Sequence, residues 1–222
     1  MLKSNQKFSN KYTTANGASR AFVNFIGLKT LWFNTGTLCN LTCKGCYIES
    51  SPTNDKLLYL SLKDVEHYIN EILINNKSCK TIGFTGGEPF MNKDIIEILE
   101  LCLVKGFDVL VLTNAMQPMQ NKINNLKKLS KFKKLKLRVS LDHFCMSEHE
   151  KIRGKKTWDK ALRGIELLIN NNFNLNIASR ILYKDEQLIR DGFAKLFKLH
   201  NFKMNANDPN DLVLFPEMDS KF

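Results

Sequence analysis

The sequence predicts an α/β fold built on a parallel β-sheet. Six apolar segments of strand length alternate with segments of helical periodicity, and the connections between them are short. The segment 107–113 is apolar almost throughout, as expected of a strand that is covered on both faces. Parallel neighbours require crossover connections, so we expect right-handed strand–helix–strand units. Eight such units would close a barrel, and six leave it open on one side.

Length and composition suit one large domain. The chain has 222 residues and a mass of 25.6 kDa, enough to bury a sizeable core. We expect residues 1–28 to be a polar N-terminal extension draped over the domain, and residues 29–222 to form its core. No apolar segment is long enough to span a membrane or to serve as a signal peptide, so the cytoplasm is the expected location. Because the chain stops at Phe222, we expect a fragment without its last helix and any C-terminal domain.

The first half of the chain is expected to contain strands at about residues 30–34, 80–85 and 107–113. Ser61 and Asp64 resemble a capping box, and the apolar residues that follow recur at helical spacing. A second helix is expected at about 93–105, where Gly106 provides the C-terminal stop.

The second half is expected to contain helices at about residues 119–130, 157–169 and 185–199 and strands at about 135–142, 174–181 and 211–215. Side chains of the strand 135–142 alternate in character, and its polar face consists of Lys136, Arg138, Ser140 and Asp142. The apolar face should meet the helices. This turns Ser140 and Asp142 toward the mouth of the barrel.

Three thiols, Cys39, Cys43 and Cys46, lie within eight residues after the first strand. Structural zinc normally takes four protein ligands, whereas a 4Fe-4S cluster held by three cysteines leaves one iron free to bind another ligand. The C-x3-C-x2-C spacing therefore favours an iron-sulfur cluster with a chemical role. Zinc, with Cys145 or His143 as a distant fourth ligand, is the alternative.

A second motif, Gly86-Gly87-Glu88-Pro89, ends the second expected strand. Its glycines let the backbone approach a ligand closely, although the motif alone is also compatible with a plain strand-to-helix turn. The carboxyl ends of parallel strands share one rim, so we expect this motif, the cysteine loop and Ser140 to meet there.

With C-x3-C-x2-C after the first strand and GGEP after the second, the sequence from about residue 29 onward resembles the radical S-adenosylmethionine (SAM) superfamily. The resemblance implies an incomplete (β/α)6 TIM-like barrel with a 4Fe-4S cluster and SAM as cofactors. It implies that the free iron chelates SAM, which is reductively cleaved to methionine and a 5′-deoxyadenosyl radical that abstracts hydrogen from a substrate. Such an oxidoreductase needs an electron donor such as flavodoxin or ferredoxin.

The same resemblance suggests ligands for each cofactor. The three cysteines are the expected metal ligands, and residues 86–89 are expected to hold the amino group of SAM. Ser140 and Asp142 match the position at which a polar side chain meets the ribose. Arg153 resembles the arginine that pairs with the SAM carboxylate, since a guanidinium fork fits a carboxylate. The alternatives are that Asp142 only caps the next turn and that Arg153 is a solvated surface residue.

Three further residues are candidates for the cofactor or substrate pocket. Asn114 ends the third strand, and Arg180 lies on the fifth, from which it can reach the mouth. The family usually has an aromatic residue just before the third cysteine. This chain has Gly45 there and Tyr47 just after that cysteine, so Tyr47 is the candidate for packing near the adenine.

The formal net charge of +11 invites an acidic partner, including nucleic acid. The basic run 127–138 straddles a helix end and a strand, so its charges would not form one face, and solvation is the better account of them. The SLD and RG patterns are closest to members that modify peptides or proteins and carry C-terminal cysteine-rich extensions. An RNA-modifying enzyme and a non-catalytic iron-sulfur or zinc module are the alternatives.

Overall fold

The computed structural model describes residues 8–75, 78–181 and 185–216. Its sheet has six strands in the order of the sequence. They are β1 (Thr30–Asn34), β2 (Thr81–Thr85), β3 (Asp108–Thr113), β4 (Leu135–Ser140), β5 (Asn174–Ile181) and β6 (Leu212–Pro216). Every neighbouring pair is parallel. The predicted α/β fold with an open, six-stranded parallel sheet is confirmed.

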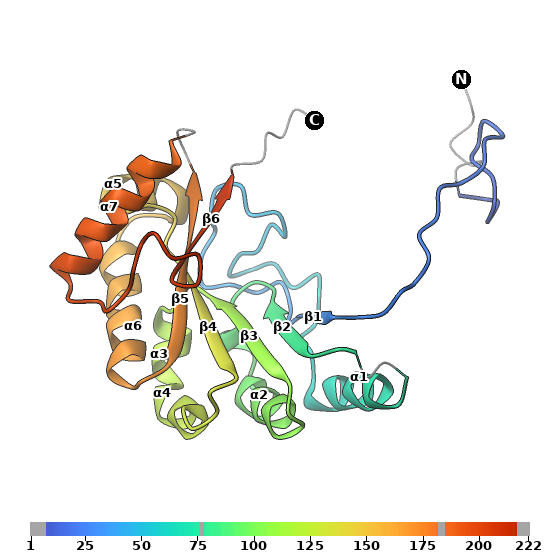
Figure 1. Cartoon of the computed structure of the whole chain (residues 1–222), viewed down its shortest axis with the longest axis horizontal. Coiled ribbons are helices and arrows are strands. Elements are labelled where there is room, and N and C mark those ends of the chain that lie inside the picture. The colour runs from blue at the N-terminus through green and yellow to red at the C-terminus, as the bar shows by residue number, and fades with distance from the viewer. Residues whose placement is uncertain (1–7, 76–77, 182–184, 217–222) are drawn as a thin grey trace.

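Helices line the outer side of the curved sheet, as Figure 1 shows. The longer ones are α1 (Leu62–Asn75), α2 (Ile95–Val104), α6 (Trp158–Asn170) and α7 (Glu186–Leu199). Ser61 and Asp64 form the predicted capping box: Asp64 N–H donates to Ser61 Oγ (3.2 Å), and Ser61 N–H donates to Asp64 Oδ2 (3.1 Å). None of the described helices is long and apolar enough to cross a membrane.

The helix expected at 119–130 is wrong in form. The chain there makes three short pieces, namely α3 (Gln117–Asn121), α4 (Ile123–Leu126) and the 3-10 helix η3 (Lys127–Leu129). Asparagine side chains compete with the backbone for hydrogen bonds, and this segment is rich in them. A continuous helix is therefore not favoured.

Helix α5 (Met146–Arg153) was not predicted. It has no apolar stripe, and among its residues only His149 is buried, packed edge-on against Trp158 with ring centroids 5.5 Å apart. The available signals were Glu148 in its first turn, Lys151 and Arg153 in its last turn, and Gly154 after it.

The described part of the N-terminal extension, residues 8–28, does not drape over the domain. Figure 1 shows that it runs away from the sheet. Phe22, Val23, Phe25 and Ile26 are between 78% and 96% exposed, so they make little contact with the core. The expectation of a segment draped over the domain was therefore wrong for residues 8–28.

The core lies between the sheet and its helices. Leu135, Leu137, Val139 and Leu141 are all buried, which confirms the predicted apolar face of β4. On α6, Gly164 allows the helix to touch the chain just beyond β3, since a Cβ there would lie 1.9 Å from Ala115 O. This contact fixes the segment that follows Asn114 at the rim.

We predict that Gly164→Ala lowers the free energy of unfolding by about 2 kcal/mol, because the new methyl group meets backbone that cannot rotate away. Alanine's higher helix propensity offsets only part of this loss. Urea unfolding is the measurement, and Arg163→Ala, at an exposed position of the same helix, is the control, with an expected change within about 0.5 kcal/mol. Equal stability of the two variants would contradict the close packing of α6.

Candidate functional site at the carboxyl rim of the sheet

The cysteine loop leaves the carboxyl end of β1 and is anchored by distant segments. Cys39 is buried, and the other two thiols of the loop are half-buried. Cys39 N–H donates to Ser51 O (3.0 Å), and Lys44 N–H donates to Ile152 O in α5 (2.8 Å). Backbone hydrogen bonds therefore fix the loop at its first cysteine and at the residue after its second cysteine.

The glycines of the GGEP motif pack the turn directly on this loop. Gly87 N–H donates to Gly36 O (2.8 Å), and Glu88 N–H donates to Leu38 O (3.1 Å). A Cβ at Gly87 would lie 2.0 Å from Leu38 O, so no other residue fits there. Gly86 has φ +133, a conformation that glycine adopts readily. In this structure, the close backbone approach is made to the cysteine loop.

The carboxylate of Glu88 is buried and accepts three hydrogen bonds. Oε1 accepts from Phe90 N–H (3.1 Å) and from Thr113 Oγ1 (2.8 Å), and Oε2 accepts from Asn114 N–H (2.8 Å). Burial raises the pKa of Glu88 to about 6, against the hydrogen bonds, which favour the charged form. This side chain therefore joins the ends of β2 and β3.

Asn114 extends the network to the cysteine loop. Its Nδ2 donates to Asn40 Oδ1 (2.9 Å), and its Oδ1 accepts the backbone N–H two residues further on. Since Asn40 directly follows Cys39, hydrogen bonds connect Glu88 to the neighbour of the first thiol. Asn114 lies at the rim, as predicted. Sequence reasoning missed Asn40 and Thr113, for which adjacency to Cys39 and Asn114 was the only signal.

Asp142 and Arg153 form a buried ion pair. Arg153 Nε donates to Asp142 Oδ2 (2.7 Å) and Nη2 donates to Oδ1 (3.3 Å), while Arg180 Nε lies 3.4 Å from Oδ1. The side chains of Asp142 and Arg153 are 5% and 13% exposed, so the alternative of a solvated Arg153 was wrong. Burial opposes the charge of Asp142, but the two guanidinium groups outweigh it and hold the pKa of Asp142 below its ordinary value.

Arg180 also reaches the cysteine loop, which confirms its expected place at the mouth. A Cβ at Gly45 would lie 3.6 Å from Arg180 Nη1, so the guanidinium stands beside the position before the third cysteine. Ser140 ends β4 on the same rim and is half-buried, and Pro89 is buried at the start of the 3-10 helix η2 (Pro89–Met91). Tyr47 is 78% exposed.

The cysteine loop has the donors and the neighbouring charge that suit a 4Fe-4S cluster. Burial raises the pKa of Cys39 to about 12 and also raises that of Cys43, while the charge of Arg153 lowers both. Metal coordination deprotonates thiols and thereby offsets the cost of burial. Cys39, Cys43 and Cys46 are the residues that would hold the cluster, with Arg153 balancing part of its negative charge.

The zinc alternative requires Cys145 or His143 as a fourth ligand, and both residues lie between β4 and α5, outside the cysteine loop. Cys145 is exposed, its Sγ lies 3.2 Å from Ser147 Oγ, and its N–H donates to His143 Nδ1 (3.0 Å). Among the residues that the structure describes, no group of three or more His, Cys, Asp or Glu side chains is arranged so that it could hold one metal ion. A cluster takes each thiol on a different iron, so its ligands need not converge on one point. Cys102 is a buried thiol, as predicted.

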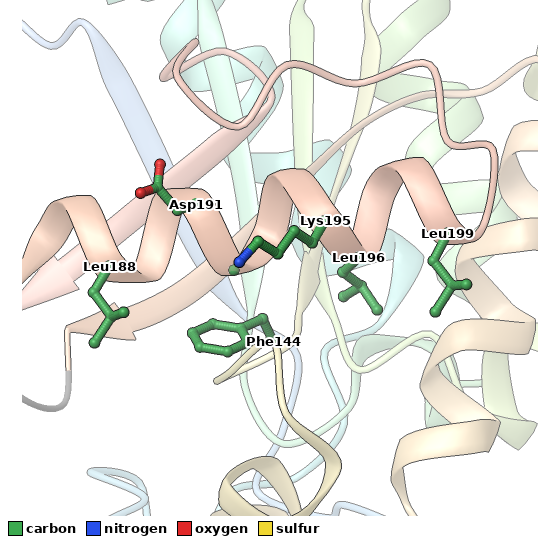
Figure 2. Close-up of a pocket in the computed structure, with 7 residues that line it drawn as sticks. Phe144, Leu188, Asp191, Lys195, Leu196 and Leu199 are labelled. Carbon is green, nitrogen blue, oxygen red and sulfur yellow. The ribbon is translucent and has the colours of Figure 1, made fainter.

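A hollow on the outer surface lies between α7 and the loop after β4 (Figure 2). Its lining includes Phe144, Leu188, Asp191, Lys195, Leu196 and Leu199. Phe144 packs on Gly192, where a Cβ would lie 2.3 Å from the ring. None of the predicted site residues lines this hollow, so it belongs to the helical layer and not to the rim.

Comparison with known families decides what this rim is. The family described as Radical SAM superfamily matches residues 33–188, more than half of the chain. The chain belongs to the radical SAM superfamily. Members of this superfamily use a 4Fe-4S cluster and SAM, and the matched residues include the cysteine loop, the GGEP turn and the Asp142–Arg153 pair.

Two curated relatives share part of this radical SAM chain. The antilisterial bacteriocin subtilosin biosynthesis protein AlbA of Bacillus subtilis (strain 168) is 29% identical over 183 residues, which are 79% of this chain and 39% of AlbA. A GTP 3′,8-cyclase of Haemophilus influenzae (strain PittEE) is 26% identical over 149 residues, which are 66% of this chain and 43% of the cyclase. The chain thus spans less than half the length of either relative.

Solved structures share the fold. Streptococcus suis SuiB bound to S-adenosylmethionine matches with a TM-score of 0.69 and 15% identity over 88% of this chain and 42% of SuiB. SuiB bound to the precursor peptide SuiA matches with a TM-score of 0.68 and 15% identity over 86% of this chain and 40% of SuiB. The partial barrel of this radical SAM chain is therefore that of its superfamily.

We predict that Glu88 makes stability depend on pH. Its folded pKa of about 6 lies above the ordinary 4.5, so the protonated form favours folding: the contribution is full below about pH 4.5 and is lost as pH rises through 6. Relative to Glu88→Gln, which cannot titrate, the wild-type chain should lose about 2 kcal/mol over this range. Urea unfolding of the reduced, metal-free chain at a series of pH values measures the difference. A constant difference would contradict the raised pKa.

Proposed function

We propose that this protein cleaves SAM reductively at a 4Fe-4S cluster held by Cys39, Cys43 and Cys46, and uses the 5′-deoxyadenosyl radical to take hydrogen from a peptide or protein. The observation that carries the proposal is the meeting of the three-thiol loop and the GGEP turn on one rim. Residues 29–222 are proposed to form the catalytic core.

The residues of the rim are proposed to bind and orient SAM. The backbone of Gly86 and Gly87, and the turn ending at Pro89, would face its amino group, while Ser140 would meet the ribose. Glu88 and Asn114 act by holding the turn and the loop together, because their polar atoms are already bonded within the protein. When bound, the cluster supplies the electron for cleavage.

Two arginines are proposed to meet the charged end of SAM. Arg153 and Arg180 share Asp142, and a guanidinium has five N–H donors, so each retains N–H groups for the SAM carboxylate. Asp142 fixes their orientation and prevents their mutual repulsion. Tyr47, exposed beside the third cysteine, is proposed to cover the adenine.

A peptide or protein substrate is supported by the names of the relatives. AlbA belongs to the biosynthesis of a bacteriocin, and SuiB has been crystallised with a precursor peptide. We propose a flavodoxin or ferredoxin as the electron donor and the cytoplasm as the location, because free thiols and a reducible cluster need a reducing compartment.

The test is anaerobic reconstitution with iron and sulfide, followed by SAM and dithionite. Stoichiometric iron and sulfide and the release of 5′-deoxyadenosine are expected, and each of Cys39→Ala, Cys43→Ala and Cys46→Ala should reduce both to background, because a cluster corner loses its ligand. Cys145→Ala, at an exposed thiol outside the loop, is the matched control and should behave like the wild type. Stoichiometric zinc without sulfide would refute the proposal.

A further inference from the structure

Arg138 lies inside the half-barrel, on the face of the sheet that the helices leave uncovered. Side chains alternate along β4, and the neighbours Leu137 and Val139 are buried toward the helices. In register, Arg138 stands between Leu112 of β3 and Asn176 of β5. Its side chain therefore points into the interior of the open barrel.

This arginine is half-buried, and its charge has no acidic partner among the residues that the structure describes. Its Nε donates to Asn176 Oδ1 (3.2 Å), and within the described chain no carboxylate lies within 4.0 Å of its guanidinium. Burial lowers the pKa of Arg138. Buried charges in proteins are normally paired, because desolvation of an unpaired ion is costly. The two terminal nitrogens of Arg138 can therefore donate hydrogen bonds to an anion that is not part of the described chain.

Among the described residues, the acidic side chains on or next to β3, β4 and β6 do not pair with Arg138. Asp142 is paired with Arg153 and Arg180. Asp211 precedes β6, two strands away, and its Oδ2 accepts from Asn205 N–H (2.7 Å). Asp108 lies exposed at the first residue of β3, at the opposite end from the rim.

The surroundings of Arg138 combine positive charge with an apolar floor. Lys136 projects on the same face of β4, with its Nζ on Asn210 O (3.3 Å). Leu110 and Leu112, half-buried on β3, lie opposite Lys136 and Arg138 in register. Such a surface suits a flexible chain that presents an anion between apolar atoms, rather than a run of phosphates, which would need several exposed cations in a row.

We propose that Arg138 receives a carboxylate of the substrate, so that the substrate is a peptide presenting an acidic side chain or its C-terminal carboxylate to the open barrel. This inference rests on the proposed function. Arg138 precedes Ser140 by two residues, about 7 Å along the strand, so a residue bound there lies beneath the rim at which SAM is expected. The two terminal N–H groups of the fork match both oxygens of a carboxylate.

The probes are three acetylated pentapeptides of alanine that differ at the centre and at the C-terminus. One has a central glutamate and an amidated end, one a central glutamine and an amidated end, and one a central glutamine and a free carboxylate. Each is titrated calorimetrically into the reconstituted protein with SAM and without reductant. The glutamate peptide or the free-carboxylate peptide should bind about tenfold tighter than the neutral one, and which of them does so identifies the source of the carboxylate.

Variants assign the preference to one side chain. Arg138→Gln should abolish it, Arg138→Lys should retain part of it, and Arg163→Gln, which removes the same charge from an exposed position of α6, should leave it intact. The wild-type comparison needs no variant, so a misfolded Arg138→Gln does not block the test.

Several results would overturn the inference. They are equal binding of the three peptides, a preference that survives Arg138→Gln in the folded variant, and an Arg138→Gln variant that loses SAM affinity as strongly as peptide affinity. Tighter, Arg138-dependent binding of oligouridylate would replace the peptide by RNA. Because no reductant is present, a failure to cleave SAM in the separate activity assay would refute the proposed function and not the carboxylate preference.

Discussion

The buried carboxylate of Glu88 is the contact on which the arrangement of the rim depends. It holds the end of β2 against the end of β3, and through Asn114 and Asn40 it reaches the residue next to the first thiol. A buried carboxylate that lost these donors would leave several polar groups unsatisfied at once, each at a cost of about 1–3 kcal/mol. Glu88 is therefore a buried residue that helps to position the cysteine loop through hydrogen bonds.

The buried charges at the rim and inside the barrel differ in whether they have a partner of opposite charge. At the rim, the buried charge of Asp142 is balanced by Arg153 and Arg180, which leave this group with one positive charge in excess. Inside the barrel, Arg138 has an amide oxygen as its polar partner in the described chain, and its charge is not balanced there. Departures of this kind from the usual pairing of buried charge are expected at functional sites.

Much of this structure follows from local patterns. The alternation along residues 135–142 placed both faces of β4 correctly, and the capping residues Ser61 and Asp64 located the start of α1. Helix α5 was missed because it is anchored by His149 against Trp158, a contact between segments that periodicity does not relate. The segment 117–129 is broken into three short pieces, as its asparagine content favours.

The positions of the candidate residues in the fold were predictable from the sequence, whereas the hydrogen bonds and ion pairs between them were not. Spacing and topology brought the thiols, the GGEP turn, Asn114 and Ser140 to one rim. Arg153 and Asp142 are eleven residues apart in the sequence, and a loop and helix α5 bring them together. No sequence motif encodes this approach. For the same reason, the role of Asn40 became visible only in three dimensions.

The tight packing at Gly87 has a consequence for mutational scanning of this turn. An alanine there would push its methyl group into Leu38 O, so the cysteine loop would move whether or not SAM ever touches the turn. A mutational scan would therefore report lost cofactor affinity at Gly87 even if the loss came only from displacement of the cysteine loop. The proposed contacts to SAM along this stretch are better probed by changing the cofactor, for instance by methylating its amino group, than by changing the glycine.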